Sequence, residues 1–320
     1  MHETGNGTYL VTGGSGFIGR HLVSRLVSLG HHVIVVDNHS TSRPGPVSSS
    51  IKLIEKNASD LDINELPPLD GIYHLASMAA PRLFREHPMM VIRPNVHGTE
   101  LMTKLAELND CRVVYTSSSE TYGSSGDPES LQSMKENHPS SHLLLSDKSP
   151  YSSAKVLGEE IVRAAFEGGV DACAIRLFNV YGENMDPTLQ GRGRVIPNFQ
   201  NALLNGHSIP IEGDGSQSRT FTWIEDVIDA LVEIMRFENL LPVVMNLGSE
   251  ETVTILELAK MMAEIMEVRP EFEYTNRLSG DPDWRCPDCS LLRMTIGWAP
   301  STSIEIGLQK LLKQKQEVET

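Results

Sequence analysis

Short apolar runs alternate with segments of helical periodicity through the first half of the chain. The runs, which predict five buried strands, lie at residues 9–12, 33–36, 71–75, 112–116 and 172–177. The intervening segments, which predict helices, lie at residues 18–29, 84–109 and 152–166. In the first of these, Ile18, Leu22 and Leu26 show the helical spacing, and Gly30 ends it. Strands that are apolar on both faces and alternate with helices predict an α/β fold with a doubly wound parallel sheet.

The second half of the chain is less regular. Residues 179–218 and 270–302 are rich in glycine and proline. The predicted elements around them are a helix at 225–237, a strand at 243–247, a helix at 254–267 and a final helix at the C-terminal end. No clean linker separates the halves, so they are expected to interleave. The expected units are residues 1–178, with residues 219–248 returning to them, and a smaller C-terminal α/β lobe of residues 179–320.

The composition of the 320 residues is that of a globular protein, with 40% hydrophobic and 22% charged residues. The formal net charge of −15 argues against a nucleic-acid partner, which needs a basic face. No apolar run approaches the ~20 residues that span a bilayer. The polar N-terminus does not have the apolar core of a signal peptide. Four cysteines do not make a disulfide scaffold. We therefore expect a cytoplasmic protein without a membrane partner.

A glycine-rich segment, residues 12–19, joins the first predicted strand to the first predicted helix. That context is what a dinucleotide-binding turn requires. Gly13 permits the tight turn, Gly16 lets the backbone approach a pyrophosphate, and Gly19 lets the helix pack close to the strand. The N-terminus of the helix then faces the phosphates. The segment predicts a Rossmann-type cofactor site.

An acidic residue at the end of the second strand favours NAD over NADP. Asp37 can accept hydrogen bonds from the adenosine ribose hydroxyls and repels a 2′-phosphate. Asp60 is open to two interpretations, a contact with the adenine or the N-cap of a helix. The other residues expected at the cofactor site are Phe17, Ile18, Asn38, Leu75, Ala76 and Asn95.

Tyr151 and Lys155 are four residues apart and therefore share one helix face. An ammonium beside a phenol favours the phenolate, so Lys155 is expected to lower the pKa of Tyr151. A phenolate can take a proton from a sugar hydroxyl while a hydride leaves for NAD. Residues 117–119, all serines, follow the fourth predicted strand, where the ligand crevice of such a sheet opens. Together these residues predict an oxidation site beside the nicotinamide.

With these pieces in place, the chain resembles the extended short-chain dehydrogenase/reductase family, in its nucleotide-sugar epimerase/dehydratase branch. The N-terminal matching motifs are Thr-Gly-Gly-Ser-Gly-Phe-Ile-Gly (12–19), His-Leu-Ala (74–76), Asn-Val-His-Gly-Thr (95–99) and Ser-Ser-Ser-Glu-Thr-Tyr-Gly (117–123). The later ones are Tyr-Ser-Ser-Ala-Lys (151–155), Arg-Leu-Phe-Asn-Val-Tyr-Gly (176–182), Gly-Asp-Gly-Ser-Gln-Ser-Arg-Thr-Phe (213–221), Asn-Leu-Gly (246–248) and Gly-Trp-Ala-Pro (297–300).

The resemblance implies a role for each matching position. Tyr151 is the expected base, Lys155 its partner and an anchor for the ribose, and Ser118 a hydrogen-bond partner of the sugar O4. Asn179 lies where the family binds the sugar diphosphate. Arg219 and Arg285 lie where arginines of the family hold phosphate or reach toward the sugar. The residues expected to bind the nucleotide sugar are Ser77, Asn179, Val195, Arg219 and Arg285.

The two residues after Ser118 bear on which reaction follows oxidation at C4. Dehydratases of the family place Asp-Glu there, where the Glu removes the C5 proton and the Asp protonates the leaving C6 hydroxyl. This chain has Ser119 and Glu120, so it matches the base and departs from the acid. A Glu buried near a nicotinamide is expected to have a raised pKa. The leading hypothesis is 5,6- or 4,6-dehydration of a UDP-hexose or UDP-N-acetylhexosamine, with Glu120 as the C5 base.

Three alternatives stay open. In a 4-epimerase of a UDP-hexose or UDP-hexosamine, Glu120 would be a structural or solvated carboxylate. For a UDP-glucuronate decarboxylase, Arg285-Cys-Pro-Asp288 resembles that group's Arg-Lys-Pro-Asp, whereas residues 151–155 depart from its Tyr-Asp-Glu-Gly-Lys. An NAD-binding sensor or scaffold without turnover would not need the intact Ser118, Tyr151 and Lys155.

Two further expectations concern metals and assembly. Cys286 and Cys289 form one Cys-x-x-Cys pair with no second pair of ligands, and the histidines show no ligand spacing, so no metal is expected. By analogy with the family, the helices at about 97–109 and 152–166 are expected to form the contact of a homodimer.

Overall fold

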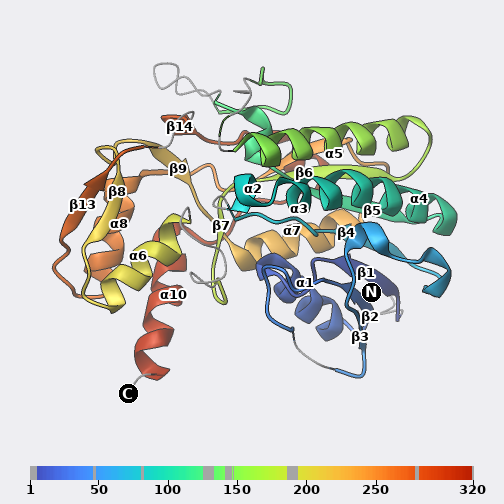
Figure 1. Cartoon of the computed structure of the whole chain (residues 1–320), viewed down its shortest axis with the longest axis horizontal. Helices are drawn as coiled ribbons and strands as arrows, with labels where there is room; N and C mark the ends of the chain where they lie inside the picture. Colours follow the sequence, from blue (N-terminus) through green and yellow to red (C-terminus); the bar gives the residue numbers. More distant parts are fainter. Residues whose placement is uncertain are drawn as a thin grey trace.

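The computed structural model describes residues 6–45, 48–80, 83–124, 133–140, 146, 148–185, 194–277 and 281–318, with side chains up to residue 313. In this part of the chain, one seven-stranded sheet is flanked by helices on both faces, and three smaller sheets accompany it (Figure 1). The predicted α/β fold with a doubly wound parallel sheet is confirmed. A search of the described helices for a bilayer-spanning apolar segment finds none.

The strands are β1 (Thr8–Thr12), β2 (His32–Val36), β3 (Ile51–Ile54), β4 (Gly71–His74), β5 (Arg112–Ser118), β6 (Ala172–Leu177), β7 (Val180–Tyr181), β8 (Ile209–Glu212), β9 (Ser218–Thr220), β10 (Thr222–Trp223), β11 (Val244–Leu247), β12 (Thr252–Thr254), β13 (Phe272–Thr275) and β14 (Trp284–Arg285). The α-helices are α1 (Phe17–Ser28), α2 (Leu83–Glu86), α3 (Pro88–Arg93), α4 (Thr99–Asn109), α5 (Ser149–Glu167), α6 (Val195–Leu204), α7 (Ile224–Arg236), α8 (Ile255–Ile265), α9 (Ser290–Ile296) and α10 (Ile304–Val318). The short turns are η1 (Ala58–Asp60), η2 (Ile63–Glu65) and η4 (Ser119–Tyr122), all 3₁₀, and η3 (Pro94–Gly98), which is a π turn.

The large sheet has the strand order β11-β6-β5-β4-β1-β2-β3, with every neighbouring pair parallel. The sequence pattern missed β3, because this edge strand has only four residues and Lys52 interrupts its apolar run. At the opposite edge, β11 comes from the second half of the chain and pairs with β6. The strand order reverses between β1 and β4, and a crevice opens beside the carboxyl ends of strands at such a point.

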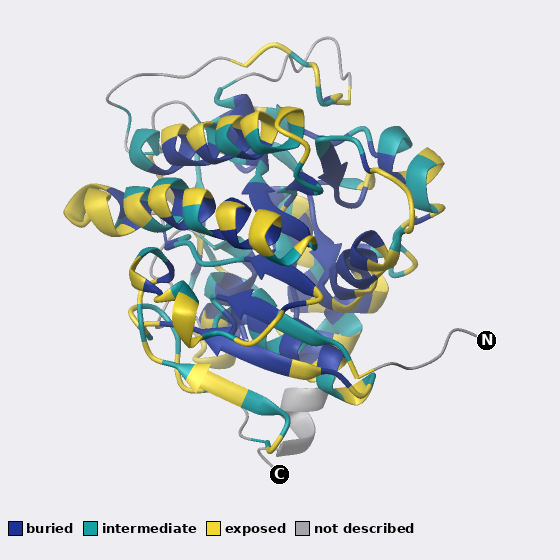
Figure 2. Cartoon of the chain, turned by 90° about the vertical axis from the view of Figure 1, so that its right-hand side faces the viewer, coloured by how far each residue is buried: buried dark blue, intermediate teal, exposed yellow. Residues whose placement is uncertain are grey.

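Alternate strand residues pack on opposite sides of this sheet. Leu10 and Ile34 join a cluster with residues of α4 and α5, whereas Val11 and Val35 join a cluster with residues of α1 and α7. Figure 2 shows the result, buried strands between helices whose outer faces are exposed. Burial of both faces explains why these strands are apolar along their whole length.

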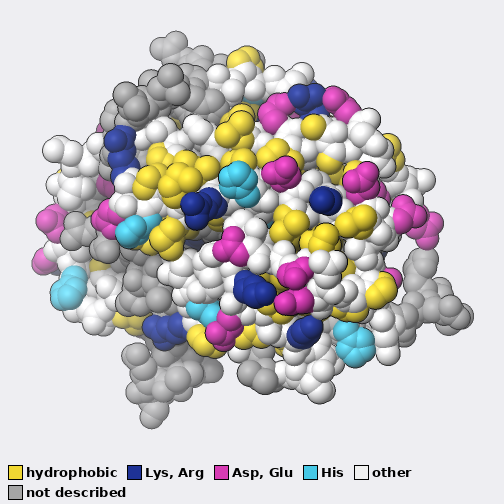
Figure 3. Space-filling view, turned by 45° about the vertical axis from the view of Figure 1, so that its right-hand side comes forward, with side chains coloured by type: hydrophobic (Ala, Val, Ile, Leu, Met, Phe, Trp, Pro, Cys, Tyr) yellow, Lys and Arg dark blue, Asp and Glu magenta, His cyan; other side chains and the backbone are white. Residues whose placement is uncertain are grey.

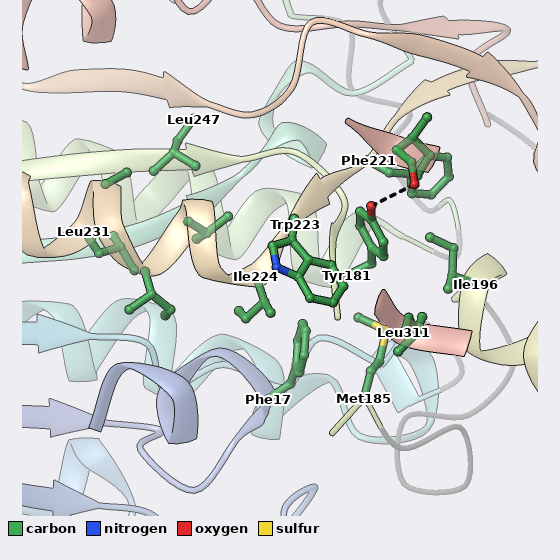
Figure 4. Packing of buried hydrophobic residues seen from close by; sticks show 14 of the residues in the cluster. Phe17, Tyr181, Met185, Ile196, Phe221, Trp223, Ile224, Leu231, Leu247 and Leu311 are labelled. Carbon is green, nitrogen blue, oxygen red and sulfur yellow. Dashed lines mark hydrogen bonds between the residues drawn. The ribbon is translucent and has the colours of Figure 1, made fainter. Parts of the chain in front are cut away.

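The C-terminal lobe contains the parallel pair β8–β13 and the three-stranded sheet β12-β9-β14. Its core is continuous with that of the large sheet: Phe17 of α1 and Leu311 of α10 lie in one cluster with Tyr181 and Trp223 (Figure 4). The Tyr181 hydroxyl donates to the Ile304 carbonyl at 3.3 Å. This shared packing fixes the lobe against the large sheet.

The glycine- and proline-rich stretches contain more regular structure than their composition suggested. The first includes α6, β8 and part of β9, and the second includes β13, β14 and α9. These elements are short, so their periodic signals are weak. The predicted helices and strand of this half correspond to α7, β11, α8 and α10. The division into two units at residue 178 stays a prediction.

Candidate active site

A cleft of about 420 Å³ opens at the carboxyl ends of β1 and β4, where the strand order reverses. The predicted site residues that line it are Gly13, Gly16, Phe17, Ile18, Gly19, Asp37, Asn38, Leu75, Ala76 and Ser77. A second, more open depression runs along β3 and contains none of the predicted site residues. The fold therefore brings most of the predicted cofactor residues to one place.

The glycines of the first turn are required by its geometry. Gly13 has a φ of +70°, and a Cβ there would lie 2.8 Å from the Ala76 nitrogen. A Cβ on Gly19 would overlap the Gly13 carbonyl, so α1 can approach the turn this closely only with glycine at that position. At Gly16 only the Gly13 carbonyl is close, at 3.1 Å. The turn is thus shaped to bring backbone amides and the start of α1 to a phosphate.

Asp37 presents a fixed carboxylate at the end of β2. Its Oδ2 accepts from the Ser15 amide at 3.0 Å, and its Oδ1 accepts from the His39 amide at 2.8 Å and the Ser42 hydroxyl at 2.9 Å. A carboxylate has about four acceptor sites, so capacity remains for hydroxyl donors of a ligand. A buried negative charge at this point suits ribose hydroxyls and disfavours a phosphate, and these residues fit NAD.

Asp60 is not a helix cap, because Asn57 occupies the N-cap of η1 and Asp62 that of η2. The Asp60 carboxylate instead accepts from the Asn57 amide at 2.7 Å and the Ser59 hydroxyl at 3.0 Å. Ser59 lines the cleft and Asp60 does not. The contact between Asp60 and the adenine stays a prediction.

Asn95 is fully buried behind the cleft. Its Nδ2 donates to the Ser77 hydroxyl at 2.9 Å and to the Val91 carbonyl at 2.7 Å, and its Oδ1 accepts from the Tyr115 hydroxyl at 3.1 Å. In this structure Asn95 therefore positions Ser77. Its direct contact with the cofactor stays a prediction.

Tyr151 and Lys155 face the end of β5 from α5. The Tyr151 ring is buried and stacks on Phe84, with ring centroids 4.7 Å apart. Lys155 Nζ donates to the Thr116 carbonyl at 2.6 Å and lies 5.7 Å from the centroid of the Tyr151 ring. Thr116 lines the cleft. The pair is thus adjacent to the cofactor cleft.

The expectation that Lys155 lowers the pKa of Tyr151 was wrong for this structure. Burial raises the pKa of Tyr151, and the opposing effects of Ser118 and Arg194 are smaller. Burial also lowers the pKa of Lys155, to about 7. The ammonium is directed at the Thr116 carbonyl rather than at the phenol, which explains its weak influence on the phenol.

Ser118, the last residue of β5, caps the turn η4, which contains Glu120. The Ser118 hydroxyl accepts from the Glu120 amide at 3.2 Å, and Ser119 between them is buried. Glu120 Oε1 lies 3.0 Å from Arg285 Nη1 and 3.4 Å from Lys148 Nζ. Two cations therefore contact the carboxylate that the sequence predicted as the base.

The expected raised pKa of Glu120 was also wrong. Burial raises the pKa, but Arg285 and Lys148 together outweigh it and the net shift is downward. Glu120 is therefore ionised at neutral pH, and it can accept a proton but has none to donate.

Asp281 extends this ion network. It lies 3.0 Å from Lys148 Nζ and 2.7 Å from Arg219 Nη2. Arg285 is almost completely buried and also donates to the Gly123 carbonyl. Arg219 and Arg285 therefore lie together beside Glu120, and their contact with the nucleotide sugar stays a prediction.

Four predicted substrate residues lie outside the cleft lining: Arg219 and Arg285 of the ion network, and Asn179 and Val195. Asn179 is exposed, has a φ of +30°, and donates to the Thr220 carbonyl at 2.8 Å. Val195 is the first residue of α6 and is half-buried against the core. Their roles in binding the substrate stay predictions.

Sequence reasoning missed several charged residues at the site, among them Lys56 and Arg93 of the cleft lining. Lys148 and Asp281 belong to the ion network, and Arg194 lines the cleft with its Nη2 3.5 Å from the Ala79 carbonyl. Spacing offered a signal for two of them, since Lys148 precedes Tyr151 by three residues and Asp281 precedes Arg285 by four. Arg194 carries no comparable signal.

The Cys-x-x-Cys pair packs within the protein. The Cys286 and Cys289 thiols are buried and donate to the Glu250 and Gly248 carbonyls. Among the described residues, no group of histidine, cysteine and acidic side chains has an arrangement that could hold a metal ion.

The predicted homodimer stays a prediction. Leu108 of α4 and Leu157 of α5 are exposed, as are Met89 and Met90 of α3. On this side of the molecule, apolar side chains gather among charged ones (Figure 3).

A parallel sheet with a glycine turn, an acidic residue after β2 and a Tyr–Lys pair beside the crevice defines a Rossmann-type, dinucleotide-dependent enzyme. The sequence comparison specifies this class further. The chain belongs to the NAD dependent epimerase/dehydratase family, whose family model matches residues 9–248. NAD is therefore the cofactor for which the cleft is built.

Curated relatives include UDP-glucuronic acid decarboxylase 1 of Danio rerio, which is 33% identical over 309 residues. The match covers 95% of this chain and 71% of that protein. UDP-glucuronic acid decarboxylase 4 of Arabidopsis thaliana is 34% identical over 313 residues, covering 95% and 67%.

The similar proteins with solved structures differ in the reactions and ligands that their names give. MoeE5 in complex with UDP-glucuronic acid and NAD is 29% identical with a TM-score of 0.85, and the match covers 98% of this chain and 100% of that one. TunA, an NAD-dependent NDP-hexosamine 5,6-dehydratase, is 29% identical with a TM-score of 0.84, covering 97% and 98%. The UDP-glucose 4-epimerase of Thermotoga maritima is 25% identical with a TM-score of 0.87, covering 98% and 100%.

Proposed function

We propose that the protein decarboxylates a UDP-linked hexuronic acid through a 4-keto intermediate. The observation that carries the proposal is the ion network at the end of β5, in which Arg285 and Lys148 hold Glu120 ionised. Asp281 joins Arg219 and Arg277 to this network, and Arg277 also pairs with Asp283. Among the described residues the connected network therefore has four cations and three carboxylates, so one positive charge is in excess. An excess cation beside the sugar site suits a C6 carboxylate better than an uncharged C6 hydroxymethyl group.

The residues beside the cleft would act on the C4 alcohol. Tyr151 would act as a phenolate, which the positive charge of a bound nicotinamide favours, and take the proton from the C4 hydroxyl, while Ser118 hydrogen-bonds the oxygen as it becomes a ketone. NAD, when bound, accepts the C4 hydride and later returns it. Lys155 supplies a positive charge next to the Tyr151 ring.

The ketone then makes loss of carbon dioxide possible. The C6 carboxylate is β to the C4 ketone, so the C5–C6 bond breaks with its electron pair moving into the ketone. C5 takes a proton from the solvent, and the proton held by Tyr151 returns to O4 as the alcohol is restored. The products are carbon dioxide and a UDP-pentose, and one solvent proton is consumed overall.

Decarboxylation is consistent with a serine at position 119. Loss of a C6 hydroxyl as water needs an acid, and Ser119 offers only a buried hydroxyl. The ionised Glu120 has no proton to give unless it first takes one from C5. Loss of carbon dioxide needs no acid at C6. The decarboxylase relatives at 33% and 34% identity support the same choice.

Dehydration across C5 and C6 of a nucleotide hexose is the second candidate. An ionised Glu120 suits removal of the C5 proton, as the sequence predicted. The similarity to the 5,6-dehydratase TunA supports this candidate.

The test is incubation of the purified protein and NAD with UDP-glucuronic acid, UDP-glucose and UDP-N-acetylglucosamine in parallel, followed by mass spectrometry. Loss of carbon dioxide from UDP-glucuronic acid is the expected result. Loss of water from a hexose would overturn the proposal in favour of dehydration. An isomer of unchanged mass would show that the protein is a 4-epimerase. The Tyr151→Phe variant is the control, expected to bind NAD and give no product.

A further inference from the structure

Glu159 is a buried carboxylate for which the proposed reaction has no use. It lies on α5 at the same spacing of four residues that separates Tyr151 from Lys155, so the three side chains form one stripe on the helix. The relative exposure of Glu159 is 7%. An ionised carboxylate at this depth must be compensated by strong partners.

The partners of Glu159 come from the ends of β5 and β6. The Ser117 hydroxyl donates to Oε1. Arg176 binds both oxygens, with Nε 2.9 Å from Oε1 and Nη2 2.7 Å from Oε2. Ser117 lies between Thr116, whose carbonyl holds Lys155, and Ser118, the predicted partner of the sugar O4. The β5 residue that Glu159 binds is therefore the direct neighbour of two groups of the site.

Lys155 has few compensating contacts of its own. Besides the Thr116 carbonyl, its Nζ faces the Tyr115 ring at 4.7 Å and the Tyr151 ring at 5.7 Å. His74 of β4 faces the same ammonium and is neutral, because burial lowers its pKa to about 3. Glu159 is the carboxylate that opposes the loss of the Lys155 proton.

We propose that Glu159 is a positioning residue for the Tyr151–Lys155 pair: it fixes Ser117 at the end of β5 and places a negative charge next to Lys155 on the same face of α5. The proposal rests on the role of that pair in the proposed function. Arg176 pairs with Glu159 and stacks on the Tyr122 ring, with its guanidinium 4.7 Å from the ring centroid. The stripe on α5 is thereby connected to β5 and β6, which run alongside it (Figure 1).

The charge of Glu159 is tested by Glu159→Gln, which keeps an acceptor for Ser117 and removes the negative charge. The titration of Lys155 is followed by NMR on isotope-labelled lysine side chains and assigned with Lys155→Met. We expect its midpoint, and the alkaline limb of kcat/KM, to fall by about one pH unit. Glu160→Gln is the matched control, because Glu160 is the exposed neighbour that pairs with Arg163, and it should leave both unchanged.

A second variant covers the case in which Arg176, left without its partner, unfolds the protein. The double variant Glu159→Gln with Arg176→Met removes both buried charges. Its shift of Lys155 should still be downward but smaller than that of Glu159→Gln, because loss of the Arg176 charge acts in the opposite direction. If Lys155 titrates at or above the wild-type midpoint in this folded variant, the charge role is refuted.

The positioning role is tested by Ser117→Ala, which removes the hydrogen bond and keeps the charge. We expect kcat to fall about tenfold, with KM and the pH profile unchanged. A wild-type kcat would refute this role. Turnover by Tyr151→Phe would instead overturn the proposed function, so the two failures are distinguishable.

Discussion

Arg285 Nη1 lies 3.0 Å from Glu120 Oε1, joining β14 of the C-terminal lobe to the end of β5. The sequence predicted the two residues for different tasks, Arg285 as a substrate ligand and Glu120 as a base. The structure makes them a pair, so a ligand that binds one will change the charge environment of the other.

Glu120→Gln should lower kcat by about 10²-fold, because Arg285 and Lys148 lose the carboxylate that fixes them beside the proposed sugar site. The affinity for NAD should not change, since Glu120 does not line the cofactor cleft. Steady-state kinetics and calorimetry measure the two quantities. Glu264→Gln, at an exposed position of α8, is the control. Wild-type turnover by Glu120→Gln would remove Glu120 from the mechanism.

Asp37→Asn should weaken NAD binding about tenfold, as expected for loss of a charge-assisted hydrogen bond worth about 1.5–3 kcal/mol. Discrimination against NADP should fall as well, because the variant no longer repels the 2′-phosphate. Calorimetric titration with both cofactors checks this. Asp62→Asn, at the N-cap of η2, should bind NAD normally. Equal affinity of Asp37→Asn and the wild type would place the ribose elsewhere.

His74 should make the protein sensitive to acid. Its Nε2 donates to the Pro94 carbonyl at 2.9 Å, so its Nδ1 accepts from the Thr12 hydroxyl at 2.6 Å and the ring is neutral. Burial lowers its pKa from 6.5 to about 3. Below pH 6.5 the unfolded chain therefore binds a proton that the folded protein does not, and stability falls by up to about 1.4 kcal/mol per pH unit down to about pH 3.

The measurement is urea unfolding between pH 7 and pH 4 (roughly the span in which a single His changes the slope). His74→Gln should show a shallower loss of stability than the wild type, because its amide does not titrate. His207→Gln, at an exposed position, should retain the wild-type slope. Identical slopes for His74→Gln and the wild type would mean that His74 is not the group responsible.

Arg112→Met should destabilise the fold by about 3–5 kcal/mol, since it leaves buried acceptors unpaired. The guanidinium of Arg112 lies 2.8 Å from Asp171 and donates to the Ile234, Phe237 and Asn239 carbonyls at the end of α7. Urea unfolding measures the change. Arg163→Met removes an exposed helical ion pair and should have no measurable effect.

The sequence predicted those features of the molecule that a short stretch of residues determines by itself. The turn from Gly13 to Gly19 was predictable because the backbone geometry itself demands glycine at those positions. The strand β3 was missed because an edge strand of four residues leaves almost no periodic trace. Tyr151 and Lys155 were found by spacing within one helix.

The electrostatics of the site could not be read from spacing. The pKa of Glu120 depends on Arg285 and Lys148, which come from distant segments and meet only in the folded protein. The same holds for Tyr151, where burial outweighs its cationic neighbours. A motif specifies which residue types meet, and the fold decides their charge states.

The return of β11 to the large sheet has a consequence for engineering. A fragment that stops before residue 244 would expose the edge of β6 and lose the strand that covers it. A chimera of two relatives made with a single crossover between β6 and β11 would take these two paired strands from different parents. Chimeras with two crossovers, which keep β6, α7 and β11 from one parent, should therefore express as folded protein more often than single-crossover ones.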